Sequence, residues 1–171
     1  MREIHSPYGR ALEDFHTADL IRHWPGRTVT QADNLLFSLL SLNHHPLHID
    51  AHFAAGTSFG RNIVNGTLIF AIGVGLTTSD IAGVALAHLG YENLIHLKPV
   101  FDGDTLYAKS EIISKRESTS KDDRGVVEVE TTVHNQHGED VLRFRAKLLV
   151  PKRAFAARPH THRTEPLANP C

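Results

Sequence analysis

The feature that most constrains the fold is the run at residues 67–76, which is apolar on nearly every side of a helix. A helix that is apolar all round is buried all round, because no face of it suits water. Gly73 and Gly75 lie inside the run and lower its helix propensity, which indicates that another part of the chain approaches closely. We therefore expect a central buried helix over residues 67–79.

The second half of the chain predicts an antiparallel sheet. Residues 126–135 alternate apolar and polar side chains, as a half-buried strand does. Residues 136–140 have the composition of a hairpin turn, and the alternation resumes over 141–150. The other expected strands lie at 27–30, 85–91, 94–97 and 106–117. Helices in the first half and strands in the second half together predict an α+β fold.

A helix is expected over residues 31–42, where leucines recur at helical spacing. Thr30 and Asp33 have the spacing of a helix start, because the threonine hydroxyl can cap a free N–H and the carboxylate suits the positive end of the helix. One or two helical turns are expected again at 51–55.

Between these helices lies a loop that concentrates polar side chains. Residues 43–50 read Asn-His-His-Pro-Leu-His-Ile-Asp. Pro46 fixes its own φ and disfavours helical geometry at His45, so the preceding helix must end here. Functional groups tend to gather on such rigid loops at the end of a scaffold element.

Composition limits the functions open to the chain. A formal net charge of −1 gives no electrostatic case for binding nucleic acid or an anionic membrane. The run at 68–76 is shorter than the ~20 residues that span a bilayer. Residues 1–7 show no apolar core of a signal peptide, and the single cysteine, Cys171, allows no internal disulfide. We therefore expect a cytoplasmic protein.

The length of 171 residues fits one domain. We expect residues 1–151 to form that domain, with an N-terminal arm that carries a short helix near residues 11–15. Residues 152–171 are rich in Pro, Arg, His and Ala and lack an apolar period, so we expect an extended or disordered C-terminal tail.

Several segments, in their order and spacing, resemble the MaoC-like (R)-specific enoyl-CoA hydratase family. They are the loop at 43–50, Ala54, the Val-Asn-Gly-Thr-Leu segment at 64–68 and the Pro-Val-Phe-Asp-Gly-Asp-Thr-Leu segment at 99–106. The resemblance covers residues 27–152. It implies a hot-dog fold, in which an antiparallel sheet wraps a central buried helix and residues 31–55 form an overhanging helix and loop. It also implies at least a homodimer, with CoA entering near the subunit interface.

The family's loop has the form Asp-x-Asn-Pro-(Leu/Ile/Val)-His. Its catalytic histidine falls on His48, its catalytic aspartate on Asn43 and its asparagine on His45. The departure at Asn43 matters because an amide can orient a water molecule but cannot take its proton. The loop resembles more closely a subgroup associated with branched C5 dicarboxylic acyl-CoAs, of the mesaconyl-CoA or methylmalyl-CoA kind.

The resemblance implies a hydro-lyase that reversibly hydrates an α,β-unsaturated acyl-CoA to a 3-hydroxyacyl-CoA. No metal or redox cofactor is implied, and coenzyme A enters only as part of the substrate. Hydration needs a positioned water, a base for its proton and a donor for the thioester oxygen. The sequence leaves open the acyl chain length, the branching and the preferred direction.

We assign the catalytic roles to three residues. His48 is the acid and base, since an imidazole with a pKa of ~6.5 suits proton transfer; the alternative is a structural histidine bonded to the loop backbone. Asn43 orients the water or caps the helix before it. Gly66 offers an N–H at the start of the central helix, where the dipole adds positive potential; the alternative is a glycine kept for a turn or close packing.

Substrate binding is assigned to His45, Asn65 and Arg61. His45 or His44 can share the proton work, and Asn65 is either a side-chain donor or a turn residue. Arg61 can pair with a CoA phosphate or a substrate carboxylate, the alternative being a solvated surface arginine. Asp33 and Asp50 are candidates to replace the missing aspartate.

Rival functions remain open. His44, His48 and His52 stand at i, i+4 and i+8, a spacing that suits zinc on a helix, but Pro46 breaks that helix and we expect no metal site. A thioesterase also needs a polarised thioester and an activated water. A non-catalytic acyl-CoA-binding protein stays possible because the acidic position carries Asn43.

Overall fold

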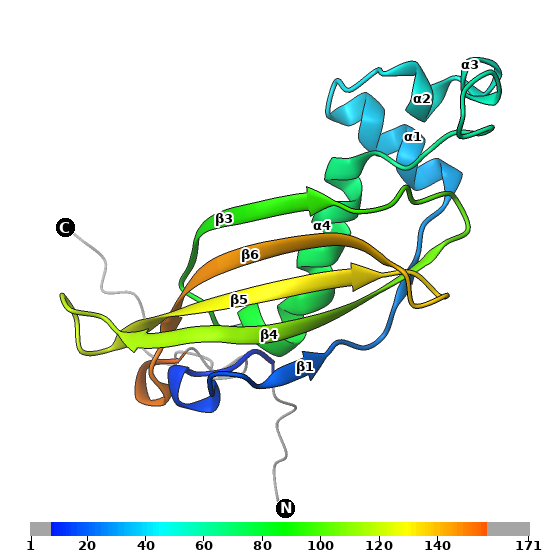
Figure 1. Cartoon of the computed structure of the whole chain (residues 1–171). Coiled ribbons are helices and arrows are strands. Elements are labelled where there is room, and N and C mark those ends of the chain that lie inside the picture. The colour runs from blue at the N-terminus through cyan, green and yellow to red at the C-terminus, as the bar shows by residue number, and fades with distance from the viewer. Residues whose placement is uncertain (1–7, 157–171) are drawn as a thin grey trace, which may run out of the picture.

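The computed structural model describes residues 8–156 (Figure 1). The first half contains the 3₁₀ helix η1 (Leu12–Asp14), the short strands β1 (Leu20–Arg22) and β2 (Arg27–Thr28), and the helices α1 (Gln31–Leu40), α2 (Pro46–Ile49), α3 (Ala51–Ala55) and α4 (Gly66–Thr77). The second half contains the π-helical turn η2 (Thr78–Ala82), the strands β3 (Ala87–His96), β4 (Thr105–Glu117), β5 (Arg124–His134) and β6 (Asp140–Pro151), and the 3₁₀ helix η3 (Arg153–Phe155).

The sheet is antiparallel, with the strand order β1-β4-β5-β6-β3 and β2 paired to β4. Alternate residues of β5 are buried and half-buried along the whole strand, which is the period of two that the sequence predicted. The expected strands at 106–117, 126–135 and 141–150 are confirmed to within two residues at each end. Within residues 8–156, β3 is an edge strand with no neighbour on its outer side (Figure 1).

Helix α4 crosses one face of this sheet, and the sheet curves around it (Figure 1). Leu68, Ile69 and Gly73 are buried against the strands. A Cβ atom at Gly73 would come within 2.9 Å of Val133 and 3.2 Å of Phe144, so only glycine lets the helix approach the sheet this closely. The close approach expected from the glycines of this run is confirmed at Gly73, whereas a Cβ at Gly75 would meet nothing within 4 Å.

The expectation that this helix is buried on every side is wrong for the part of the chain that the structure describes. Thr67, Ala71 and Gly75 are exposed on the side of α4 that faces away from the sheet. Within residues 8–156, the sheet packs against only one face of the helix. An apolar helix with one open face requires a further covering surface, and the rest of residues 8–156 does not provide it.

Helices α1, α2 and α3 form an overhang beyond the N-terminal end of α4 (Figure 1). Helix α1 begins as the sequence predicted: the hydroxyl of Thr30 accepts the N–H of Asp33 at 3.2 Å, and the carboxylate of Asp33 accepts the N–H of Thr30 at 2.8 Å. It ends at Leu40, two residues before the expected boundary. Of the expected C-terminal tail, residues 153–155 form η3, and residues 157–171 lie outside the described chain, as do residues 1–7 of the N-terminal arm.

The expected strands at 85–91 and 94–97 are one strand, β3. Two register shifts interrupt its pairing with β6, one between His88 and Gly90 and one between Glu92 and Ile95. Such bulges place an extra residue in one strand and weaken the sequence alternation, which explains why the pattern predicted two pieces.

A buried polar chain fixes the N-terminal segment to the rest of the domain. Nδ1 of His23 lies 2.8 Å from the carboxylate of Asp80 in η2, and Nε2 lies 2.8 Å from the hydroxyl of Ser110 in β4. Ser110 in turn lies 2.8 Å from the hydroxyl of Thr131 in β5. Burial lowers the pKa of His23, an effect that the nearby Arg10 reinforces and Asp80 opposes.

Stability is therefore expected to depend on pH through His23. In the unfolded chain the pKa of this imidazole is about 6.5, whereas in the folded protein its pKa is lower. Its contribution is fully present above about pH 6.5 and is lost as the pH falls, because the unfolded chain then binds a proton that the folded chain binds less well. Urea titrations at several values between about pH 5.5 and pH 8 measure the free energy of unfolding. As the pH falls, this free energy should decrease more steeply in the wild type than in His23→Gln. Equal slopes would contradict this assignment.

No helix within residues 8–156 has both the length and the apolar character that a membrane span requires.

Candidate active site

The histidine-rich loop forms two short helices joined at Asp50. Pro46 is the first residue of α2, and Nδ1 of His45 accepts the N–H of Leu47 at 3.2 Å as its N-cap. The carboxylate of Asp50 accepts the N–H of Phe53 at 2.9 Å and caps α3. The break that Pro46 predicted is therefore confirmed.

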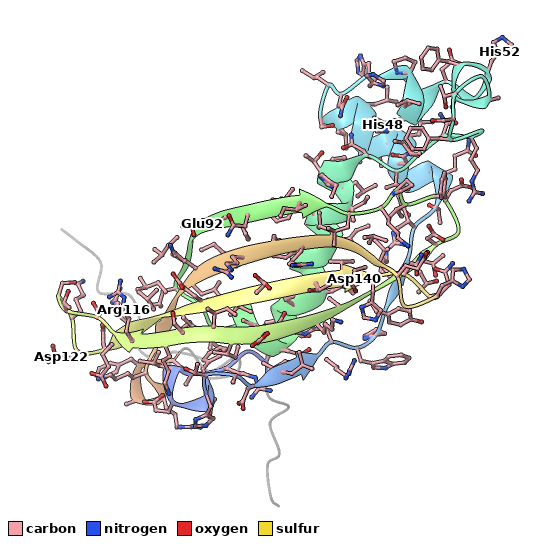
Figure 2. All side chains as sticks on the ribbon, in the orientation of Figure 1. His48, His52, Glu92, Arg116, Asp122 and Asp140 are labelled. Carbon is pink, nitrogen blue, oxygen red and sulfur yellow. The ribbon has the colours of Figure 1, made fainter. Side chains whose placement is uncertain are left out.

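This break separates the histidines at four-residue spacing. His48 lies on the inner side of the overhang, whereas His52 lies at its outer edge (Figure 2). Among the residues that the structure describes, no three His, Cys, Asp or Glu side chains are placed to hold a metal ion.

His48 is oriented by a hydrogen bond to the backbone. Its Nδ1 lies 3.0 Å from the carbonyl oxygen of Ile63. A carbonyl can only accept, so Nδ1 carries the proton and Nε2 of the neutral ring presents a lone pair. The half-buried ring is therefore held in the tautomer that a general base requires.

Asn34 joins the three segments that build the site. Its side-chain amide donates to the carbonyls of His48 at 3.2 Å and Ile63 at 3.1 Å, and its Oδ1 accepts the N–H of Asn65 at 2.8 Å. Sequence reasoning missed this residue. The available signal was an amide on a leucine-rich helix, and Asn34 is in fact buried while its leucine neighbours Leu35 and Leu36 are exposed.

Asn65 caps α4 with its side chain. Its Oδ1 accepts the N–H of Thr67 at 3.0 Å, and its amide donates to Ser38 at 3.2 Å. The carbonyl of Asn65 accepts the N–H groups of Leu68 and Ile69. These contacts give the Asn65 side chain a structural role in the chain as it stands.

The N–H of Gly66 is the first of helix α4, and within residues 8–156 it has no hydrogen-bond partner. The three N–H groups that follow it are all bound by Asn65. A free N–H at the positive end of a 12-residue helix is suited to bind an oxygen that carries developing negative charge.

His48 and Gly66 line the same cavity, which has a volume of about 310 Å³. Its other lining residues are Phe59, Ile63, Val64, Ile69, His96, Leu97, Lys98, Pro99 and Val100. Most of the wall is apolar, and the polar groups converge from the overhang, from the start of α4 and from the end of β3. Such a cavity is typical of a small-molecule site.

The remaining predicted residues do not line this cavity. Asn43 is exposed and makes no side-chain hydrogen bond to the described part of the chain. The His45 ring lies 5.9 Å from that of His48. The guanidinium of Arg61 lies 4.2 Å above the ring of Phe101, a cation–π contact that holds it at the surface.

The two aspartates considered as replacements for the missing acid serve as helix caps. Asp50 caps α3. Asp33 caps α1, and hydrogen bonds from Thr30, supported by Arg27, hold the pKa of that carboxyl below its usual value. Asp33 is therefore kept ionised at the opposite end of α1 from the loop.

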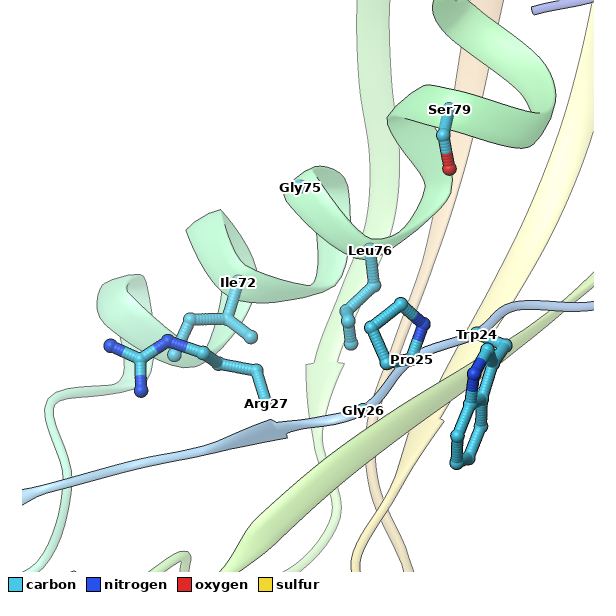
Figure 3. A pocket seen from close by; sticks show the side chains of 8 residues that line it. All are labelled: Trp24, Pro25, Gly26, Arg27, Ile72, Gly75, Leu76 and Ser79. Atoms are coloured by element: carbon cyan, nitrogen blue, oxygen red, sulfur yellow. The ribbon is translucent and has the colours of Figure 1, made fainter. Parts of the chain in front are cut away.

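A second cavity of about 370 Å³ lies beside the C-terminal half of α4 (Figure 3). Leu76 faces Pro25 across it, and Ile72 and Trp24 also line it. Its one ionisable wall residue, Arg27, is paired with Asp33 at 2.7 Å. Among the residues that line this cavity there is no histidine or carboxylate. The cavity beside His48 brings an imidazole and the N–H of Gly66 together, and it is the candidate active site.

Comparison with known proteins agrees with this geometry. The family model described as "MaoC like domain" matches residues 17–135. The chain is 38% identical over 149 residues to a mesaconyl-CoA hydratase of Cereibacter sphaeroides. The matched region covers 87% of this chain and 43% of that protein. It is 32% identical over 120 residues to an (R)-specific enoyl-CoA hydratase of Aeromonas caviae, covering 70% of this chain and 85% of that protein. The chain thus spans less than half the length of the first relative.

Solved structures show the same fold. A MaoC-like dehydratase from Rhodospirillum rubrum superposes with a TM-score of 0.75 at 27% identity, covering 85% of this chain and 99% of that chain. A protein from Mycobacterium tuberculosis, described as having a double hotdog fold, superposes with a TM-score of 0.78 at 19% identity, covering 88% of this chain and 46% of that chain. The expected α+β hot-dog architecture is confirmed.

Proposed function

The chain belongs to the MaoC-like domain family, and from that premise we propose that it is a hydro-lyase that reversibly hydrates an α,β-unsaturated acyl-CoA to a 3-hydroxyacyl-CoA. One observation carries the proposal. In the described part of the chain, a histidine whose Nε2 makes no hydrogen bond and a helix-terminal N–H without a partner line one cavity of about 310 Å³. These are the base and the oxyanion donor that hydration requires.

The proposed reaction proceeds in two steps. Nε2 of His48 takes a proton from a water molecule while the oxygen of that water bonds to C3 of the acyl group. The electrons of the double bond move onto the thioester oxygen, which the N–H of Gly66 stabilises. His48 then returns its proton to C2, so that one water has been added and the imidazole is neutral again. Asn43 orients the water in this proposal, since its amide cannot take the proton.

We propose a branched C5 dicarboxylic acyl-CoA such as mesaconyl-CoA as the substrate. The support is the 38% identity to a protein named mesaconyl-CoA hydratase. Lys98 lines the cavity, but its ammonium lies 2.6 Å from the carboxylate of Glu139 and is partly neutralised there. The proposal needs no metal or redox cofactor. It places the enzyme in the cytoplasm, which suits a chain whose one cysteine is Cys171.

The proposal is tested by measuring enoyl absorbance and free CoA after the protein is incubated with each of three thioesters. Crotonyl-CoA and mesaconyl-CoA should lose their enoyl absorbance without release of free CoA, and butyryl-CoA should stay intact. The faster of the two enoyl substrates identifies the acyl class. Release of CoA from butyryl-CoA would instead support a thioesterase, and tight binding of all three without turnover would support a non-catalytic binding protein.

We also propose that the chain acts as a homodimer joined through the edge strand β3. The apolar side chains Leu86, Leu89, Leu94, Ile95 and Leu97 are exposed on or beside this edge, and α1 exposes Leu35, Leu36, Leu39 and Leu40. An exposed apolar edge strand favours pairing with a second chain. The same partner would help to cover the open face of α4.

Light scattering coupled to size exclusion is expected to give about twice the chain mass of 19.0 kDa. Leu89→Lys should shift the protein toward the monomer, because the edge then carries a charge. Leu20→Lys is the matched control, since Leu20 is 53% exposed on the opposite edge strand β1 and Leu89 is 54% exposed. A monomeric wild type would contradict the proposal.

A further inference from the structure

His96, which the sequence did not single out, lies at the end of β3 directly against Gly66. A Cβ atom at Gly66 would lie 2.7 Å from Cε1 and 2.8 Å from Nε2 of the His96 ring. Nε2 therefore lies within about 4.3 Å of the Cα of Gly66. Glycine is needed here because any larger residue would push the imidazole away from the start of α4.

The bulge in β3 turns His96 toward the helix. Tyr91 pairs with Ala146 and His96 pairs with Leu142, and both partners lie on the face of β6 that packs on α4. Residues five apart in a regular strand point to opposite faces. Between Glu92 and Ile95 the register advances three residues on β3 but only two on β6, and this extra residue restores the common face.

The ring nitrogens of His96 are not engaged by other residues in the described part of the chain. Within residues 8–156, neither ring nitrogen of His96 makes a hydrogen bond, although the ring lines the cavity that contains His48 and Gly66. The neighbouring cation, Lys98, is held by Glu139. His96 is thus a donor available to a bound molecule at the N-terminal end of α4.

We propose that His96 is the second donor of the oxyanion site, so that its Nε2–H and the N–H of Gly66 bind the same thioester oxygen. The inference rests on the proposed hydration and names a further catalytic residue for it. The neutral imidazole is sufficient, because it donates from Nε2 when the proton resides there. A donor aimed at the oxygen on which charge develops stabilises the enolate-like transition state more than the substrate.

The distances allow both donors to reach one atom. Nε2 of His96 lies no more than about 5.3 Å from the nitrogen of Gly66, given the position of the Cβ and standard backbone geometry. Two donors that share one oxygen at hydrogen-bond lengths of about 2.9 Å stand at most about 5.8 Å apart. The separation of the two nitrogens is therefore compatible with one oxygen that accepts from both donors.

The test compares His96→Ala with His96→Gln, because glutamine keeps an N–H donor but cannot transfer a proton at neutral pH. With crotonyl-CoA, the alanine variant should lose about 10²-fold in kcat with KM changed only a few-fold, and glutamine should retain at least about a tenth of the wild-type kcat. His52→Ala, on the outer edge of the overhang (Figure 2), is the control for a distant histidine and should match the wild type. Thermal unfolding establishes that each variant is folded.

A second readout needs no turnover. Bound hexadienoyl-CoA should absorb at longer wavelength on the wild type, because two donors polarise its conjugated thioester. His96→Ala should lose most of this shift, and His96→Gln should keep most of it. If this pattern appears without hydration of any enoyl-CoA, the proposed function fails and the donor role of His96 stands.

Three results would overturn the inference. The first is an alanine variant with kcat within about threefold of the wild type. The second is a glutamine variant as impaired as the alanine variant, since that would indicate proton transfer or a purely structural role. The third is a wild-type complex without a spectral shift, or a shift that His96→Ala leaves intact.

Discussion

His48→Ala is expected to lower kcat for enoyl-CoA hydration by ~10²-fold or more while KM changes little. The physical reason is the loss of the free Nε2, which takes the proton of the attacking water. The backbone should survive the change, because the carbonyl of Ile63 that binds Nδ1 also accepts the amide of Asn34 at 3.1 Å. Initial rates of loss of the enoyl absorbance, measured over a range of crotonyl-CoA and mesaconyl-CoA concentrations, give both constants.

The control for this variant is His52→Ala, which removes another imidazole from the overhang and should leave kcat unchanged. His48→Gln adds a sharper comparison, since an amide can replace the bond to Ile63 but cannot take a proton. Its kcat should be as low as that of His48→Ala. Near-normal kcat in either His48 variant would show that another group activates the water.

Asn34→Ala is expected to destabilise the protein by about 2–4 kcal/mol, the largest stability effect in the overhang. The change leaves the buried N–H of Asn65 without an acceptor and the carbonyl of His48 without a donor. Each unsatisfied buried group costs roughly 1–3 kcal/mol. The free energy of unfolding is obtained from urea titration, and kcat should fall as well because the loop and the start of α4 lose their common support.

Gln31→Ala, at the exposed start of the same helix, is the control and should change stability by less than about 0.5 kcal/mol. Asn34→Asp separates the two halves of the network, since the carboxylate keeps the acceptor for Asn65 but loses both donors. Its stability should fall below that of the wild type. An Asn34→Ala variant as stable as Gln31→Ala would contradict the role assigned to this side chain.

The elements that depend on a short window of sequence could be predicted. The capping pair of Thr30 and Asp33 placed the start of α1, and Pro46 placed the break in the histidine loop. The apolar run placed α4, and the alternation of apolar and polar residues placed three of the four long strands. Each of these signals acts between residues close in the chain, so no knowledge of the tertiary structure was needed.

The parts that depend on contacts between distant segments could not be predicted. His96 faces the site because a bulge shifts the register of β3, and single-sequence alternation does not report which residue is the extra one. The leucines of α1 indicate an amphipathic helix, yet its polar residues Asn34 and Ser38 face inward. The open face of α4 likewise reflects a covering surface that residues 8–156 do not supply.

The predicted site residues also fall into two groups, those that line the cavity and those whose side chains contact other residues of the chain. His48 and Gly66 line one cavity, as their assigned roles require. Asn65 and Arg61 make their contacts within the chain, with Ser38 and Phe101 respectively. Their roles toward a substrate, and that of Asn43, stay predictions. A motif gives the order of residues along the chain, but the partner of each side chain depends on the packing around it.

The most direct test of the central claim is to follow the oxygen of water into product. The wild type and His48→Ala are incubated with mesaconyl-CoA and crotonyl-CoA in water enriched in the heavy oxygen isotope, and the products are analysed by mass spectrometry. We expect the wild type to place the label on the hydroxyl at C3 of an intact CoA thioester, and His48→Ala to do so at least ~10²-fold more slowly. Label in the carboxylate of a free acid, or no label from either substrate, would contradict it.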